Sequence, residues 1–201
     1  MPRSRSRRDD NLRRHIAYVA ARLMAEEGVD DYATAKAKAA RQAGLGDAHQ
    51  LPDNREVEAA LREYQGLYQA EDQPAQLRRL REAAVKAMTE FAPFRPVLVG
   101  AVLNGTATQF SEVQLHLFTD DAKALTIYLV NHRYRFETGE RRVRIADDWV
   151  DVEQVHIEVD GVPVTLSVYS LDDERIAPKP RAESEGPSRA RLAEVQALLG
   201  I

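Results

Sequence analysis

Residues 100–121 read GAVLNGTATQFSEVQLHLFTDD, the one stretch of this chain whose spacing points to chemistry. Two glycines, Gly100 and Gly105, follow an apolar run that begins after a proline. Polar and apolar side chains then alternate from residue 112 to residue 117 in the predicted strand 112–118, a period typical of a strand with one buried face. The polar face of that predicted strand carries three side chains: Glu112, Gln114 and His116.

This stretch resembles the signature of the nucleotidyltransferase fold, the DNA polymerase β-like superfamily. That signature is a glycine-serine pair, a short loop to a second glycine, and then serine-aspartate-x-aspartate on a strand. Gly100, Gly105 and Ser111 are in register with it without a gap, although an alanine replaces the first serine. Glu112 stands at the first aspartate and Gln114 at the second.

The resemblance implies a site for nucleotidyl transfer whose metal ligands are incomplete. Such transfer depends on positioning and on divalent metals, and magnesium prefers carboxylate oxygens. Gln114 offers an oxygen without a charge. The family's third carboxylate belongs on a later strand, here residues 162–169, where Thr165 or Ser167 stands at the matching position. The resemblance therefore implies a pseudoenzyme in which the catalytic carboxylates are not retained.

The expected nucleotide-binding residues lie in the glycine loop and at the start of the following strand. They are Gly100, Asn104, Gly105, Thr106, Ser111 and Gln114. Glu112 is the candidate catalytic residue and, with His116, a candidate metal ligand, with magnesium as the cofactor if the protein is an enzyme. Plainer roles stay open, because a glycine also serves a tight turn and a lone histidine on a strand is commonly just hydrogen-bonded.

The composition narrows the class of protein. The chain has 201 residues, a net charge of -4, 30% charged residues and no cysteine. These values are ordinary for a soluble protein and exclude disulfides, thiolate metal sites and cysteine nucleophiles. No apolar run approaches the roughly 20 residues of a membrane span, and no apolar segment near the N-terminus predicts a secretion signal. We therefore expect a cytoplasmic protein without a membrane partner.

Residues 10–92 predict an N-terminal helical region, preceded by a disordered basic tail over residues 1–9. Apolar residues recur at helical spacing in four segments: 10–27, 31–43, 53–68 and 74–91. Residues 32–41 and 51–54 resemble a group of bacterial proteins in which such a helical region precedes a degenerate nucleotidyltransferase-like domain. That group has no assigned activity, so this resemblance implies an arrangement and no function.

Local signals predict where the helices start and which side chains face inward. Asp30 or Asp31 is expected to cap the second helix, and Asp53 with Glu56 has the spacing of a capping box at the third. The expected inward face of the third helix is Val57, Leu61, Tyr64 and Tyr68.

Residues 93–171 predict the nucleotidyltransferase-like domain, a mixed β-sheet with flanking helices, so the fold class is α+β. The expected strands are 97–103, 112–118, 134–137 paired with 142–145, 152–159 and 162–169. Asp160-Gly161 predicts a tight hairpin turn between the last two strands. The remaining elements are a helix over 121–132 capped by Asp120, a linker over 172–187 and a terminal helix over 188–201 capped by Ser188.

Three functions are compatible with these residues. The first is a non-catalytic nucleotide-binding or regulatory module with a degenerate metal site. The second is an active magnesium-dependent nucleotidyltransferase that uses Glu112 with a displaced acid such as Asp120. The third is a protein–protein interaction module that docks a partner through its helical region. Contact of the basic tail with nucleic acid is left open.

Overall fold

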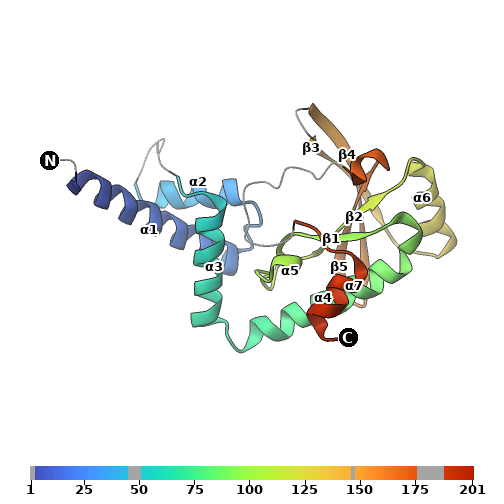
Figure 1. The fold of residues 1–201 in the computed structure, drawn as a ribbon, viewed down its shortest axis with the longest axis horizontal. Coiled ribbons are helices and arrows are strands. Elements are labelled where there is room, and N and C mark those ends of the chain that lie inside the picture. The colour runs from blue at the N-terminus through green and yellow to red at the C-terminus, as the bar shows by residue number, and fades with distance from the viewer. Residues whose placement is uncertain (1–2, 45–50, 146–147, 176–187) are drawn as a thin grey trace. The chain divides into compact units, whose positions relative to one another are not determined.

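The computed structural model describes residues 3–44, 51–145, 148–175 and 188–201, and it is a mixed α+β structure, as predicted (Figure 1). The chain divides into two compact units. The first contains Met1–Gln76 and the short segment Thr106–Ser111. The second contains Leu77–Gly105, Glu112–Pro180 and Gly186–Ile201. Among the described residues, no helix is both long enough and apolar enough to cross a membrane.

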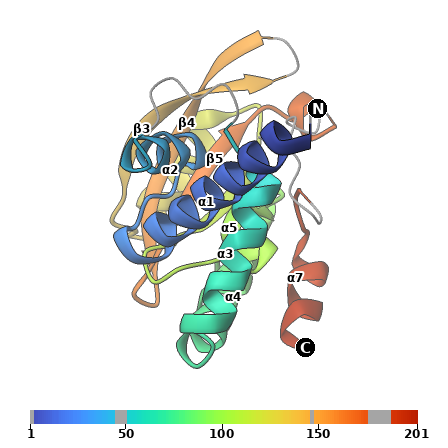
Figure 2. The ribbon, with the colours of Figure 1, turned by 90° about the vertical axis from the view of Figure 1, so that its left-hand side faces the viewer.

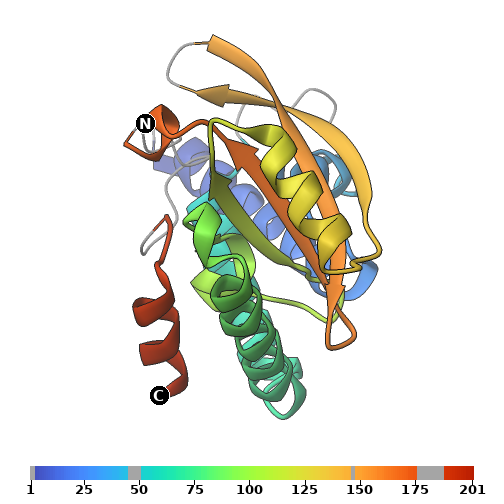
Figure 3. The same cartoon turned by 90° about the vertical axis from the view of Figure 1, so that its right-hand side faces the viewer.

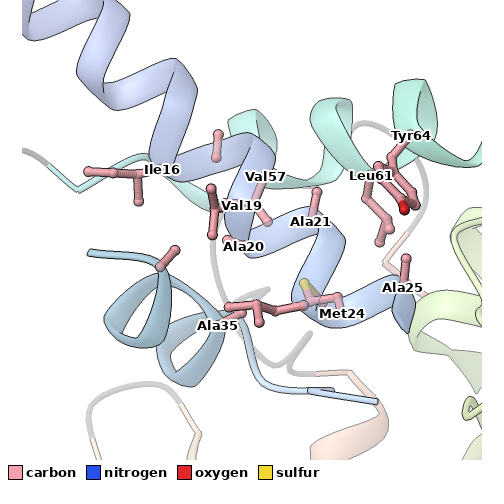
Figure 4. Packing of buried hydrophobic residues seen from close by; sticks show 13 residues of the cluster. Ile16, Val19, Ala20, Ala21, Met24, Ala25, Ala35, Val57, Leu61 and Tyr64 are labelled. Carbon is pink, nitrogen blue, oxygen red and sulfur yellow. The ribbon is translucent and has the colours of Figure 1, made fainter. Parts of the chain in front are cut away.

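The first unit is built on the helices α1 (Arg3–Glu27), α2 (Tyr32–Gln42) and α3 (Asn54–Tyr68), followed by the start of α4 (Asp72–Glu90). Both α2 and α3 pack on α1, and Figure 2 shows α1 running across α3. Many of the buried side chains between these helices are small, which lets the backbones approach closely. The fully buried alanines are Ala20, Ala21, Ala25, Ala35 and Ala39, several of which are labelled in Figure 4.

Side-chain caps start two of these helices, as predicted. The Asp31 carboxylate accepts a hydrogen bond from the Thr34 backbone N–H at 2.9 Å. Asp53 accepts from the Glu56 N–H at 2.8 Å, and the Glu56 carboxylate accepts from the Asp53 N–H at 2.8 Å. This reciprocal pair satisfies two amide groups that would otherwise lack a partner at the first turn.

Two expectations for the helical region were wrong. The tail predicted to be disordered is helical from Arg3, because arginine favours helices and a helix extends readily once its first turns are formed. Tyr68 was expected in the core, but it is 64% exposed. Its ring instead contacts that of the buried Tyr64 in a tilted arrangement, with 4.7 Å between the ring centroids, at the outer margin of the packed face.

The second unit is organised on a five-stranded sheet. Its strands are β1 (Val97–Val99), β2 (Val113–Phe118), β3 (Glu137–Ile145), β4 (Asp148–Val159) and β5 (Val162–Tyr169), in the spatial order β1-β2-β5-β4-β3. The β2–β5 pair is parallel and the other pairs are antiparallel. This mixed sheet brings β2 beside β5, although more than forty residues separate them in the chain.

Helices cover the apolar face of this sheet. Figure 3 shows α6 (Ala122–Asn131) lying across it. The second part of α4 and α6 meet in an aromatic cluster around Phe91, which is fully buried. The buried strand residues that form the sheet's share of this core are Val113, Leu115, Leu117, Val155, Ile157, Val164 and Leu166.

The predicted strand over residues 97–103 was too long. β1 ends at Val99, and residues Gly100–Asn104 form the one-turn helix α5. The reason is Gly100, whose φ of 75° takes the backbone out of the extended conformation.

In place of the two strands predicted over 134–137 and 142–145 the structure has one continuous strand, β3, which begins only at Glu137 and leaves residues 134–136 outside the sheet. Gly139 and Glu140, which lie between the two predicted segments, pair with Gln154 and Glu153 on β4. Cross-strand pairing therefore overrides the local turn preference of the glycine. The hairpin at Asp160-Gly161 is confirmed, with φ angles of 52° and 73° at its two central residues.

The two predicted helix caps in the second unit were each misplaced. Asp121, one residue later than expected, caps α6 by accepting from the backbone N–H groups of Lys123 and Ala124. The terminal helix α7 (Leu192–Leu199) begins after Arg191 and not at Ser188. It starts late because Ala190 exchanges backbone hydrogen bonds with Leu98 and so remains extended along β1.

The segment predicted as a linker opens with a short 3-10 helix, Asp172–Glu174. A second 3-10 helix, Ala92–Phe94, joins α4 to β1. The rest of the predicted linker, residues 176–187, lies outside the described residues.

Candidate functional site

The two motif glycines bracket α5. Gly100 begins the helix with a φ of 75°, and Gly105 ends it with a φ of 82° and donates its N–H to the Ala101 carbonyl. Both angles lie in the left-handed region, where a side chain is strained. The glycine spacing is therefore explained by a tight one-turn helix, and Asn104 is the last residue of that helix.

Arg81 holds the C-terminal end of α5. The Arg81 guanidinium donates to the carbonyls of Val102 and Leu103 at 3.2 Å each. Burial lowers the pKa of Arg81, but the negative end of the helix dipole compensates part of the cost of keeping the charge there. A side chain of α4 therefore fixes the carbonyl end of the motif helix.

The loop after Gly105 belongs to the first unit. Within that unit, the Gln65 side-chain amide donates to the carbonyls of Thr106 and Ala107 at 3.1 Å each, and Gln73 donates to Ala107 at 3.4 Å. Thr106 is buried. Its predicted role in nucleotide binding competes with this structural role.

The Ser111 hydroxyl is engaged inside its own turn. It accepts from the Thr108 N–H at 2.9 Å and lies 3.4 Å from the Thr108 hydroxyl. Thr106 and Ser111 thus lie in the first unit, whereas the other predicted nucleotide-binding residues lie in the second: Gly100, Asn104, Gly105 and Gln114.

The sheet brings Gln114 and Gly100 together. A Cβ atom at Gly100 would lie 2.8 Å from the Gln114 Oε1 atom, so the amide packs directly over this glycine. In the β2–β5 register, Gln114 is opposite Thr165 and His116 is opposite Ser167. The positions at which the sequence suggested a second and a third metal ligand are therefore neighbours on two parallel strands, and they carry an amide and a hydroxyl.

The candidate metal ligands do not form a cluster. Within the described ranges, no three histidine, aspartate or glutamate side chains lie close enough to hold a metal ion. Glu112 is half-buried just before β2, and His116 lies four residues further along the same face. Four residues of extended chain separate their Cα atoms by about 13 Å. The structure places these two side chains on one face without bringing them together.

The aspartates that might have served as displaced acids have structural partners. The Asp120 carboxylate accepts from the Leu171 backbone N–H at 3.0 Å and so joins the ends of β2 and β5. Asp173 accepts from the backbone N–H and the hydroxyl of Ser170, at 3.2 and 2.6 Å. With Asp121 at the N-cap of α6, these acids act as caps and turn residues.

Two hydrogen bonds on the polar sheet face were not foreseen. The Gln154 amide donates to the Ser167 hydroxyl at 3.1 Å, and the Nδ1 atom of His156 lies 2.8 Å from the Thr165 hydroxyl. In the sequence, the alternation of side chains along β4 indicates only that Gln154 and His156 share a face. Their partners follow from the β4–β5 register, which pairs Gln154 with Ser167 and His156 with Thr165.

His116 is the most perturbed ionisable group on this face. Its ring lies against the Tyr169 ring, with 4.6 Å between the centroids. Burial, followed by the positive charges of Arg189 and Arg141, lowers the pKa of His116 to about 4. The imidazole is therefore neutral near pH 7, which makes it available as a hydrogen-bonding group.

Lowering the pH is expected to destabilise the protein through His116. The unfolded chain binds a proton as the pH falls through about 6.5, whereas the folded state does so only near pH 4. Stability is therefore full above pH 6.5 and decreases between these values, by at most about 1.4 kcal/mol per pH unit. Urea unfolding at pH 7 and pH 5 measures this loss.

His116→Gln should show a smaller loss of stability between the two pH values than the wild type. His15→Gln, which removes an exposed histidine on α1, is the matched control. Equal losses in the wild type and in His116→Gln would show that the buried imidazole does not titrate as described.

Comparison of the sequence with protein-family models and with curated proteins gives no match. The fold defines a mixed α+β protein whose sheet has one apolar face and a second, more polar face that also carries a small buried cluster of Val97, Phe118, Val152 and Tyr169. The geometry of that polar face is therefore the basis on which a function is proposed.

Proposed function

We propose that this chain is a non-catalytic nucleotide-binding module built on a nucleotidyltransferase-like scaffold. One observation carries the proposal: Gln114 packs over Gly100 and stands opposite Thr165 on the parallel strand β5. According to the resemblance, Gln114 and Thr165 stand at the positions of two metal-binding carboxylates. An amide and a hydroxyl can hydrogen-bond a phosphate or a base, but they lack the charge that holds magnesium.

The order of elements supports the proposal. A glycine turn follows β1, the strand β2 carries the motif positions, and β5 returns beside β2 after an intervening helix, α6. This agrees with the order that the resemblance implies: a glycine loop, a ligand strand and a later ligand strand reached after a helix.

A nucleoside triphosphate is expected to raise the melting temperature of the purified protein in the absence of magnesium. A ligand that binds only the folded state stabilises it by mass action, by about 2.7 kcal/mol when its concentration is 100 times Kd. Thermal unfolding against a panel of nucleoside triphosphates, each with magnesium and with a chelator, measures this shift. Gln114→Leu should reduce the shift, and Gln42→Leu at the exposed end of α2 is the control.

The other outcomes separate the alternatives. A shift that requires magnesium and disappears in Glu112→Ala would support an active transferase that uses Glu112. The absence of a shift with every nucleotide would contradict the proposal and favour an interaction module that docks a protein partner through the helical region.

A further inference from the structure

Three basic side chains gather on the polar face of the sheet. His116 stands on β2, Arg141 on β3 and Arg189 immediately before the Ala190–Leu98 bridge, all in the second unit. Both arginines lie near enough to His116 to act electrostatically on its ring, and Arg141 acts on Tyr169 as well. The side chains thus converge from three elements on the region around the His116–Tyr169 ring pair.

The register explains why the three side chains share one face. At the β1 edge, Ala190 lies opposite Leu98, so Arg189 points to the face of Val97, which is itself paired with His116. At the other edge, Arg141 pairs with Val152 on β4. The two arginines therefore reach the same face from opposite edges of the sheet.

The Asp173 carboxylate also acts electrostatically on Tyr169, with a sign opposite to that of Arg141, but no carboxylate of the described ranges forms an ion pair with Arg141 or Arg189. Throughout those ranges Arg141 forms no ion pair, and its side chain is exposed. Arg189 donates one N–H to the Glu174 backbone carbonyl at 2.8 Å, which fixes its position without pairing its charge. The charged groups that shift the pKa of His116 are these two cations.

Hydroxyl groups complete the surroundings. The Ser167 hydroxyl stands opposite His116 across the parallel pair, and the Tyr169 ring is packed against the imidazole. Guanidinium groups bind phosphate oxygens in a bidentate manner, while hydroxyl and imidazole groups supply further hydrogen bonds. A cluster with two arginines that form no ion pair among the described residues, and with flanking hydroxyls, matches the chemistry of a phosphate group.

We propose that His116, Arg141 and Arg189 form a binding site for the phosphate groups of a polyphosphate anion, which they hold directly and without a divalent metal. The inference rests on the proposed nucleotide-binding function and names the part of the ligand that this face recognises.

Calorimetric titration with inorganic triphosphate and with ATP tests the inference. Both titrations are done in the presence of a chelator, so that no divalent metal is available. Arg141→Gln is expected to weaken binding of both ligands roughly tenfold or more, because it removes a charge-assisted hydrogen bond to the phosphate oxygens. Arg142→Gln removes the neighbouring exposed arginine, which points to the other face of β3, and should leave the affinity unchanged. Arg141→Lys should lie between these variants, since it keeps the charge but loses the bidentate geometry.

The outcomes distinguish this inference from the proposed function. Nucleotide binding that is equal in the wild type, Arg141→Gln and Arg142→Gln would overturn the inference and leave the proposed function standing. Binding of inorganic triphosphate that depends on Arg141, with no nucleotide bound more tightly than triphosphate, would support the phosphate site and contradict nucleotide recognition. An absence of binding by triphosphate and by every nucleotide would overturn both.

Discussion

Gly100→Ala is expected to lower the free energy of unfolding by about 2–4 kcal/mol. An alanine at a φ of 75° carries a backbone strain of roughly 1–2 kcal/mol. Its Cβ atom would also lie 2.8 Å from the Gln114 Oε1 atom, which forces the amide away from its position on β2. Urea unfolding followed by circular dichroism at pH 7 measures the change.

Two further variants separate the strain from the contact. Gly44 has a φ of 70°, but a Cβ atom at this position would meet nothing within 4 Å among the described residues, so Gly44→Ala should show the backbone cost alone. Gln114→Ala in the Gly100→Ala background should recover the part due to the contact. Equal losses in Gly100→Ala and Gly44→Ala, with no recovery in the double variant, would show that Gln114 does not pack over the motif glycine.

Phe91→Ala is expected to cost about 3–5 kcal/mol, the range for removing a fully buried aromatic ring. Phe91 is completely inaccessible to solvent, and its ring centroid lies 5.6 Å from those of Tyr128 and Tyr134. The cavity would open where the end of α4 meets α6, so both helices lose packing against the sheet. The same urea unfolding measurement gives the loss.

Trp149→Ala is the matched control for removal of an aromatic side chain in the same unit. Trp149 is 60% exposed on β4, and its loss should change the free energy of unfolding by less than about 1 kcal/mol. A cost for Phe91→Ala as small as that for Trp149→Ala would contradict the packing described for α4 and α6.

Part of the candidate site could be predicted from the sequence because its signals are local. The alternation over residues 112–118 placed Gln114 and His116 on one face of a strand, and β2 covers this stretch. The tight-turn role that was left open for Gly105 is observed, with a φ of 82°, whereas Gly100 was expected inside a strand and instead ends it with a φ of 75°. The family resemblance could indicate which positions belong to the candidate site, but it could not show that Gln114 packs over Gly100.

Other features of the site depend on contacts between residues far apart in the chain. The carbonyls of Thr106 and Ala107 are held by Gln65, about forty residues earlier, so the loop composition alone could not assign it to the helical unit. Arg141 and Arg189 share a face with His116 only because the strand register turns both side chains to that face from the two edges of the sheet. An arginine on a strand has no sequence signal for such a neighbour.

The sequence by itself determined the elements whose ends are set within one turn. Asp31 and the Asp53–Glu56 pair start their helices, and Asp160-Gly161 closes its hairpin, since each needs only nearby backbone groups. Tertiary structure alone decided that residues 137–145 form one strand, because pairing with β4 outweighs the turn preference of Gly139. It also decided which polar side chains share a face, because strand order and register arise from burying distant apolar residues together.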